Sequence, residues 1–115
     1  MATEQRSAEM AHLASLYTVR GEAEVDEFLH GNPQVLPVLL DAHTQICRVF
    51  GRDTPITLEV VDDPEIESYT LLWALIQVDM EADEAADKLD VLGKDWWYSA
   101  VRPVGDHFGI DVDFV

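Results

Sequence analysis

The chain has 115 residues, of which 48% are apolar and 26% charged, and this predicts one globular domain with a core of its own. Twenty-three acidic residues stand against seven basic ones, for a formal net charge of −16. Nucleic acids and anionic membranes bind basic surfaces, so the composition argues against both as direct partners. The single cysteine, Cys47, excludes an internal disulfide.

The chain contains no segment that predicts membrane insertion. Its longest apolar run, Leu71–Ile76, is far shorter than the roughly 20 residues of a spanning helix. The first ten residues, MATEQRSAEM, lack the apolar centre of a signal peptide. We therefore expect a cytoplasmic protein.

Apolar residues at helical spacing predict two helices at the start of the chain. The first covers 3–20 and ends at Gly21, and the second covers 22–30. Their apolar stripes contain Met10, Leu13, Ala14, Leu16, Tyr17, Val25, Phe28 and Leu29. Because one small core has limited room for such stripes, 1–30 is interpreted as a helical extension. A homodimer through 3–30 is one way in which its apolar surface would be buried.

Asn32-Pro33 predicts the start of a third helix, with Asn32 as the N-cap, and the helix runs to Gly51. Pro37 stands about one turn in, where the regular helix either begins or kinks. The predicted apolar stripe consists of Leu36, Leu39, Leu40, His43, Cys47 and Phe50.

The second half changes to strand patterns. Residues 56–61 alternate, 69–78 form an apolar run typical of a central strand buried on both faces, and 110–115 alternate again. A helix remains the alternative for 69–78. Residues 81–100 predict a helix with a short second turn, whose inner face is formed by Ala82, Ala85, Ala86, Leu89 and Leu92.

The predicted fold class is α+β, with three amino-terminal helices followed by β-β-α-β in a single domain, 1–115. We expect a small mixed three-stranded sheet with helices over its faces. Glu59, Asp111 and Asp113 would place charge on its open edges and discourage pairing with other chains.

Several acidic residues and one histidine are of the types that bind metal ions or act in catalysis. Asp62, Asp63, Asp79 and His107 form a candidate set for a metal-assisted enzyme, which requires that they converge at one cleft. The acidic loop at 62–67 lacks the alternating acids and central glycine of a calcium loop, so a solvated turn is favoured.

His43 and Cys47 lie one helical turn apart, a spacing that suits two zinc ligands or a Cys-His nucleophile pair. No further ligands or orienting group stand at regular spacing, so a place in the core is favoured for both. Glycine-rich phosphate loops, G-x-S-x-G, H-E-x-x-H and C-x-x-C are absent from the sequence. We therefore predict no cofactor and favour a non-enzymatic function.

The strongest candidate for a binding site is the aromatic triplet Trp96, Trp97 and Tyr98, with Asp90 and Asp95 as flanking charges. Neighbours on a helix point about 100° apart, so at least one of the three rings should lie near the surface. The residues after Leu58 also hold fifteen acids against three bases, a net −12. Charge of one sign speeds association with a basic partner, and aromatic side chains often hold such complexes together.

The second half also resembles a group of small uncharacterised bacterial proteins. The resemblance rests on LEVV-DDPE (58–65), LIQVDM-EADEAADKLD (75–90), WW (96–97) and IDVDF (110–114), and covers roughly 55–115. It implies an acidic α+β protein with no activity attached, similar to antitoxins or immunity proteins. The leading hypothesis is thus an interaction domain for a basic protein. The alternatives are a nucleic-acid-mimicking inhibitor and the metal-assisted enzyme.

Overall fold

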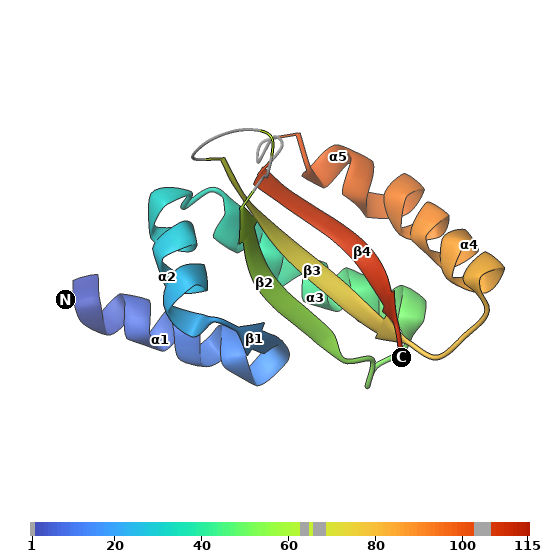
Figure 1. Cartoon of the computed structure of the whole chain (residues 1–115), viewed down its shortest axis with the longest axis horizontal. Helices are drawn as coiled ribbons and strands as arrows, with labels where there is room; N and C mark the ends of the chain where they lie inside the picture. Colours follow the sequence, from blue (N-terminus) through green and yellow to red (C-terminus); the bar gives the residue numbers. More distant parts are fainter. Residues whose placement is uncertain (1, 63–64, 66–68, 103–106) are drawn as a thin grey trace.

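The computed structural model describes residues 2–62, 65, 69–102 and 107–115. The chain forms an α+β fold in which a four-stranded mixed sheet is covered by helices (Figure 1). The helices are α1 (Ala2–Leu16), α2 (Glu22–Gly31), α3 (Val35–Phe50), α4 (Ala82–Leu92) and α5 (Tyr98–Ala100). The strands are β1 (Thr18–Arg20), β2 (Ile56–Asp62), β3 (Thr70–Val78) and β4 (Phe108–Phe114).

The strands lie in the order β1-β2-β3-β4. The β2–β3 pair is antiparallel, and the β1–β2 and β3–β4 pairs are parallel. The predicted β-β-α-β succession of the second half is therefore confirmed, with β3 as a central strand. The predicted three-stranded sheet is wrong, because β1 adds a fourth strand beside the first half of β2.

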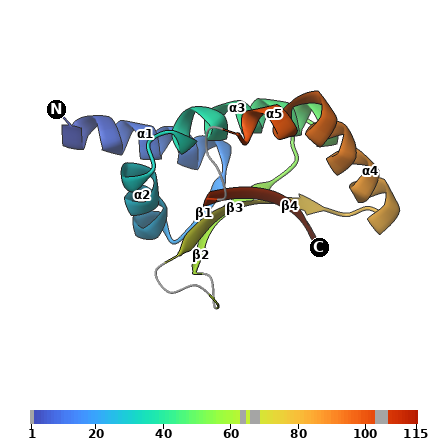
Figure 2. The same cartoon turned by 90° about the horizontal axis from the view of Figure 1, so that it is seen from above.

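The helices cover one face of the sheet. Figure 2 shows α1, α3, α4 and α5 on the same side, and α2 lies near β1 and also contacts β2. No helix covers the opposite face in the part of the chain that the structure describes. The prediction of helices over both faces is wrong, because the helices that the structure describes form a single layer on one face of the sheet.

The core lies between this layer and the sheet. Leu72, Ala74, Ile76 and Val78 of β3 face the helices and are at most 2% exposed. Met10, Leu13 and Tyr17 of α1 and Val25, Phe28 and Leu29 of α2 are buried in the same core. Most of the amino-terminal stripe is therefore covered within one chain, whereas Ala14 is exposed and Leu16 is partly buried. A dimer through 3–30 stays a prediction.

The end of the first helix differs from the prediction. α1 ends at Leu16, and Thr18–Arg20 extend along β2 instead of continuing the helix to 20. Three residues are too few to show an alternating pattern, and their pairing depends on a strand about 40 residues later in the chain. Gly21 is the N-cap residue of α2 and has a φ of 75°, a left-handed conformation that suits glycine.

The start of α3 is also corrected. Asn32 does not cap α3, because its side-chain amide donates to the Phe28 carbonyl and its backbone N–H to the Leu29 carbonyl, both at the end of α2. α3 begins at Val35, so Pro37 lies in its first turn, where a missing N–H costs little. The residues that α3 buries fully are Val35, Leu39, Ala42 and Ile46, so the buried face is rotated from the predicted stripe, and Leu36, Leu40, His43, Cys47 and Phe50 lie at its border.

The predicted helix over 81–100 is divided. α4 ends at Leu92, a π-helical turn (η1, Gly93–Trp97) follows, and α5 completes the segment. Ala85 and Leu92 of α4 are buried, whereas Ala82 and Ala86 are exposed, which corrects the predicted inner face. A π turn holds one more residue than an α turn, so it changes which faces the following side chains occupy.

Candidate interaction surface

The aromatic triplet lies on the π turn and at the start of α5. Trp96 is half-buried, and its indole N–H donates to the Asp41 carboxylate of α3 at 2.7 Å. Trp97 is half-buried on the sheet side, with its ring edge-on to Phe108 and the ring centroids 5.4 Å apart. Both indoles thus hold the α4–α5 segment against the rest of the chain.

Tyr98 is the exposed member of the triplet, at 57%. This confirms the prediction that the three rings cannot all enter the core. Its ring lies so close to Gly93 that a Cβ there would stand 2.5 Å from the ring. The triplet therefore offers a partner one exposed phenol and parts of two indoles.

The two acids that flank the triplet are exposed and already have basic partners. The Asp90 carboxylate lies 2.9 Å from the Lys94 ammonium, and the Asp95 carboxylate 3.4 Å from the Arg48 guanidinium. The hydrogen bond and the charge of Asp90 raise the pKa of Lys94. Asp90 and Asp95 are therefore neutralised in part within the chain.

The other exposed acids of this segment lie on and before α4, on the side that faces the solvent. Asp83, Asp87 and Asp90 follow one another at helical spacing and face the solvent, opposite the buried Ala85 and Leu92. Asp79, Glu81 and Glu84 are exposed around the start of the same helix. The only base of α4, Lys88, points to the other side, where its ammonium donates to the Val49 carbonyl of α3 at 3.2 Å. We call Glu81, the N-cap residue, and the four exposed acids of the helix, Asp83, Glu84, Asp87 and Asp90, the acidic face of α4; Asp90 also pairs with Lys94.

A cavity of about 350 Å³ opens at the start of β4. The Trp73 ring lies over Gly109, where a side-chain Cβ would stand 2.5 Å from the indole. Glycine is thus required at 109 for Trp73 to reach across β4. Trp97 and Val101 form the helical wall, and the remaining lining residues are Leu71, Phe108 and Ile110. We call this space the β4 cavity.

Polar side chains bridge the strands on the open face of the sheet. Gln77 donates to the Thr57 hydroxyl at 3.3 Å and to the Asp113 carboxylate at 3.1 Å, and so links β2, β3 and β4. On β1 and β2, the Arg20 guanidinium lies 3.0 Å from the Glu59 carboxylate. The prediction that Glu59 lies on an open edge of the sheet is wrong, because β1 pairs with the strand β2 that contains it.

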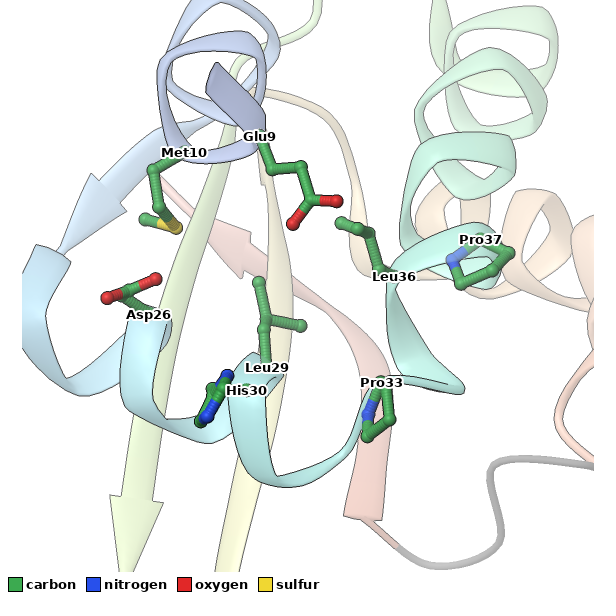
Figure 3. Close-up of a pocket in the computed structure, with 8 residues that line it drawn as sticks. All are labelled: Glu9, Met10, Asp26, Leu29, His30, Pro33, Leu36 and Pro37. Carbon is green, nitrogen blue, oxygen red and sulfur yellow. The ribbon is translucent and has the colours of Figure 1, made fainter. Parts of the chain in front are cut away.

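A second hollow, of about 240 Å³, lies among α1, α2 and α3 (Figure 3). Met10, Leu29 and Leu36 form its apolar part, and Glu9 extends into the space from α1. Asp26 and His30 line it from α2. Glu9 and Asp26 each have an interaction partner within the chain.

His43 and Cys47 do contact each other, with the thiol sulfur 3.7 Å from the imidazole Nε2. Burial, and secondly the charge of Asp53, raise the pKa of the Cys47 thiol. A nucleophilic cysteine needs a lowered pKa to form its thiolate, so the shift has the wrong direction for catalysis. The His43 ring also packs edge-on against Tyr17, which supports a packing role for the pair.

The metal candidates do not converge on one cleft. Asp62 pairs with Thr70 at one end of the β2–β3 hairpin, and the Thr70 carbonyl lies 3.5 Å from the His107 Nδ1. Asp79 follows the other end of β3, roughly 25–30 Å away at the rise of a strand. Asp63 lies outside the described residues. Across the described part of the chain, no three His, Cys, Asp or Glu side chains form a group that could hold a metal ion.

Trp73 and Gly109 line the β4 cavity but carry no sequence signal for a surface role. Trp73 stands inside an apolar run that predicted burial, and Gly109 stands beside a strand as an ordinary loop glycine. Only the register of β3 and β4, which pairs these two residues, gives them a common role.

Comparisons with family models, curated proteins and solved structures produce no match for this chain. The resemblance to small acidic bacterial proteins stays a prediction. None of the helices in the described ranges is long and apolar enough to cross a membrane.

Proposed function

We propose that the protein is a non-enzymatic, acidic interaction domain that binds a basic protein partner, in the manner of antitoxins or immunity proteins. The observation that carries the proposal is the acidic face of α4, where four carboxylates of one short helix and that of its N-cap residue are exposed. Such a field raises the rate at which a basic surface is encountered and disfavours acidic competitors.

The position of α4 adds apolar contacts to this charge. Tyr98 is exposed at the end of the same helical segment, and Trp97 connects that segment with the β4 cavity. Aromatic side chains beside complementary charge are the usual composition of an interface hot spot. The acidic face of α4 would steer the partner, and the aromatic groups would slow its release.

The test is a native mass measurement of the untagged protein, expressed in its own host and purified gently. We expect a complex of defined stoichiometry with a protein of basic isoelectric point. A chain recovered alone or bound only to itself would overturn the proposal. A nucleic-acid mimic would instead be identified by displacement of its partner's DNA or RNA.

A matched pair of variants locates the surface. Asp83→Asn, Glu84→Gln and Asp87→Asn together remove three charges from α4, and Glu22→Gln, Glu24→Gln and Glu27→Gln remove three from the exposed side of α2. We expect the α4 variant to bind the partner at least about tenfold more weakly, through slower association, and the α2 variant within about twofold of wild type. Equal losses would indicate a dependence on net charge alone and would contradict a site on α4.

A further inference from the structure

The outer edge of β4 has backbone groups that face away from the sheet. Strand order places β4 at an edge, and its seven residues contrast with the three of β1 at the other edge. The Val115 N–H donates to the Val78 carbonyl at 3.0 Å. Because backbone groups alternate along a strand, the amides of Ile110, Val112 and Phe114 point away from β3.

One of these outward amides already has a local acceptor. The Val112 N–H donates to the carboxylate of its own neighbour, Asp111, at 2.8 Å. Such a contact between adjacent residues is easily exchanged for a carbonyl of an incoming strand. Within the described ranges, no other backbone segment pairs with this side of β4. An unpaired edge of this length is a template for strand addition.

The edge is bounded by apolar surface at both ends. The β4 cavity lies at its start and is large enough for one apolar side chain. At its end, Phe114 is 52% and Val115 77% exposed. A strand lying along β4 would therefore meet apolar groups at two separated positions and hydrogen-bonding groups between them.

Charge decides which occupant fits this edge. Asp111 and Asp113 lie on β4, and the helix α4 lies on the β4 side of the sheet in both views (Figures 1 and 2). The acids of α4 are exposed to the solvent there. A second copy would bring two rows of aspartates together, and like charges on paired strands are destabilising. A segment with Lys or Arg on alternate residues would instead place its cations beside these carboxylates.

From these observations we propose that the outer edge of β4 binds an extended, basic segment of the partner by strand addition, with one apolar side chain of that segment in the β4 cavity. The proposal rests on the proposed function and names the surface and the form of the partner. The acidic face of α4 steers the approach, and the β4 edge supplies backbone hydrogen bonds.

Two synthetic peptides test this on the full chain. The first alternates lysine and valine over ten residues, and the second alternates lysine and proline, with the same charge but without half of the N–H donors. By calorimetry, we expect the first peptide to bind at least about tenfold more tightly. In amide NMR spectra, its binding should shift the signals of Ile110, Val112 and Phe114 most. Equal affinities, or no binding of the lysine–valine peptide, would overturn the proposal.

The variant Val112→Pro blocks the edge on the protein side. The Val112 N–H that the substitution removes makes no hydrogen bond to β3. Proline is tolerated on an edge strand where the N–H of the replaced residue points outward. We expect a folded protein that binds the lysine–valine peptide at least about tenfold more weakly; undiminished binding would contradict strand addition. If this variant does not fold, the affinities of the two peptides for the wild-type protein decide whether the β4 edge binds by strand addition.

The same variant separates this inference from the proposed function. A native complex that survives Val112→Pro but is lost in the α4 variant would leave the proposed function standing and remove the β4 edge as its site. A homodimer of the wild type that Val112→Pro dissolves would identify a second copy as the occupant and overturn the inference.

Discussion

The two faces of the central strand differ more than its sequence indicates. On the helical side, Leu72, Ala74, Ile76 and Val78 are almost fully buried. On the open side, Leu71, Trp73, Leu75 and Gln77 are all partly exposed. Both sets are largely apolar, so hydrophobicity does not distinguish them, and the expectation that β3 is buried on both faces is half right.

Because the described helices cover only one face of the sheet, the two faces are stabilised by different interactions. The covered face contributes burial of apolar area, which supplies most of the stability of a domain. The open face is held by side chains that span the strands, such as Gln77 between Thr57 and Asp113. It also presents Trp73, which a second layer would have covered.

Truncation of one leucine on each face gives the largest expected contrast. Leu72→Ala removes a fully buried side chain and should lower the free energy of unfolding by about 2–5 kcal/mol. Leu75→Ala removes the same atoms from the open face and should cost about half as much or less. Urea unfolding measures both, and equal losses would mean that the open face is covered in solution.

A methyl group at Gly109 tests the packing of Trp73 across β4. In Gly109→Ala the added Cβ would collide with the indole, so we expect a loss of about 1–3 kcal/mol and a change in tryptophan fluorescence. Gly31→Ala is the control, because nothing lies within 4 Å of a Cβ at the end of α2. A neutral effect at both positions would contradict the position of Trp73 over Gly109.

Tyr17 tests a polar contact on the covered side. Its buried hydroxyl donates to the Leu39 carbonyl at 2.6 Å, and Tyr17→Phe should cost about 1 kcal/mol at neutral pH. Burial raises the pKa of this phenol well above its ordinary value. The folded state therefore resists deprotonation, and the stability from Tyr17 is present below about pH 10 and lost as pH rises above it.

Urea unfolding of the wild type and of Tyr17→Phe at neutral and alkaline pH measures how the stability from Tyr17 changes with pH. The stability of the wild type should fall more steeply above about pH 10 than that of Tyr17→Phe. All other titrating groups are common to the two proteins and cancel in the difference. A parallel decline would show that Tyr17 is not buried as a neutral phenol.

The ion pair on the open face should have the smallest effect. Arg20 and Glu59 join β1 to β2, but their side chains are 59% and 32% exposed. Arg20→Gln should therefore cost at most about 0.5 kcal/mol, and the difference should vanish near 0.5 M salt. Thermal unfolding at two salt concentrations measures it. A cost that persists in high salt would indicate packing of the arginine stem.

Particular residues show how far prediction from the sequence reached. The helix over α2, most of α3, and the strands β2, β3 and β4 follow from periodicity and agree with the structure within a few residues. That at least one ring of the triplet is exposed follows from helical geometry alone, and the structure shows that this ring is Tyr98. By contrast, β1, the cap that Asn32 makes on α2 and the π turn at Gly93–Trp97 depend on contacts between distant segments.

The candidate site was predicted in part. The excess of acids in the second half and the aromatic triplet point to the same part of the chain as the surface proposed here, which stays a prediction. The sequence could not show that Asp90 and Asp95 pair with Lys94 and Arg48, or that Trp96 bonds Asp41. These partners are set by the packing of α4 and the π turn on α3.

The sequence by itself determined the helices and strands with strong periodicity, the α+β class and the excess of acidic charge, because each is a property of local residue order or of composition. The tertiary structure decided which face of β3 is covered, which carboxylates have basic partners and which strand edge is free. These depend on register and layer packing, where residues far apart in the chain meet, as Trp73 meets Gly109.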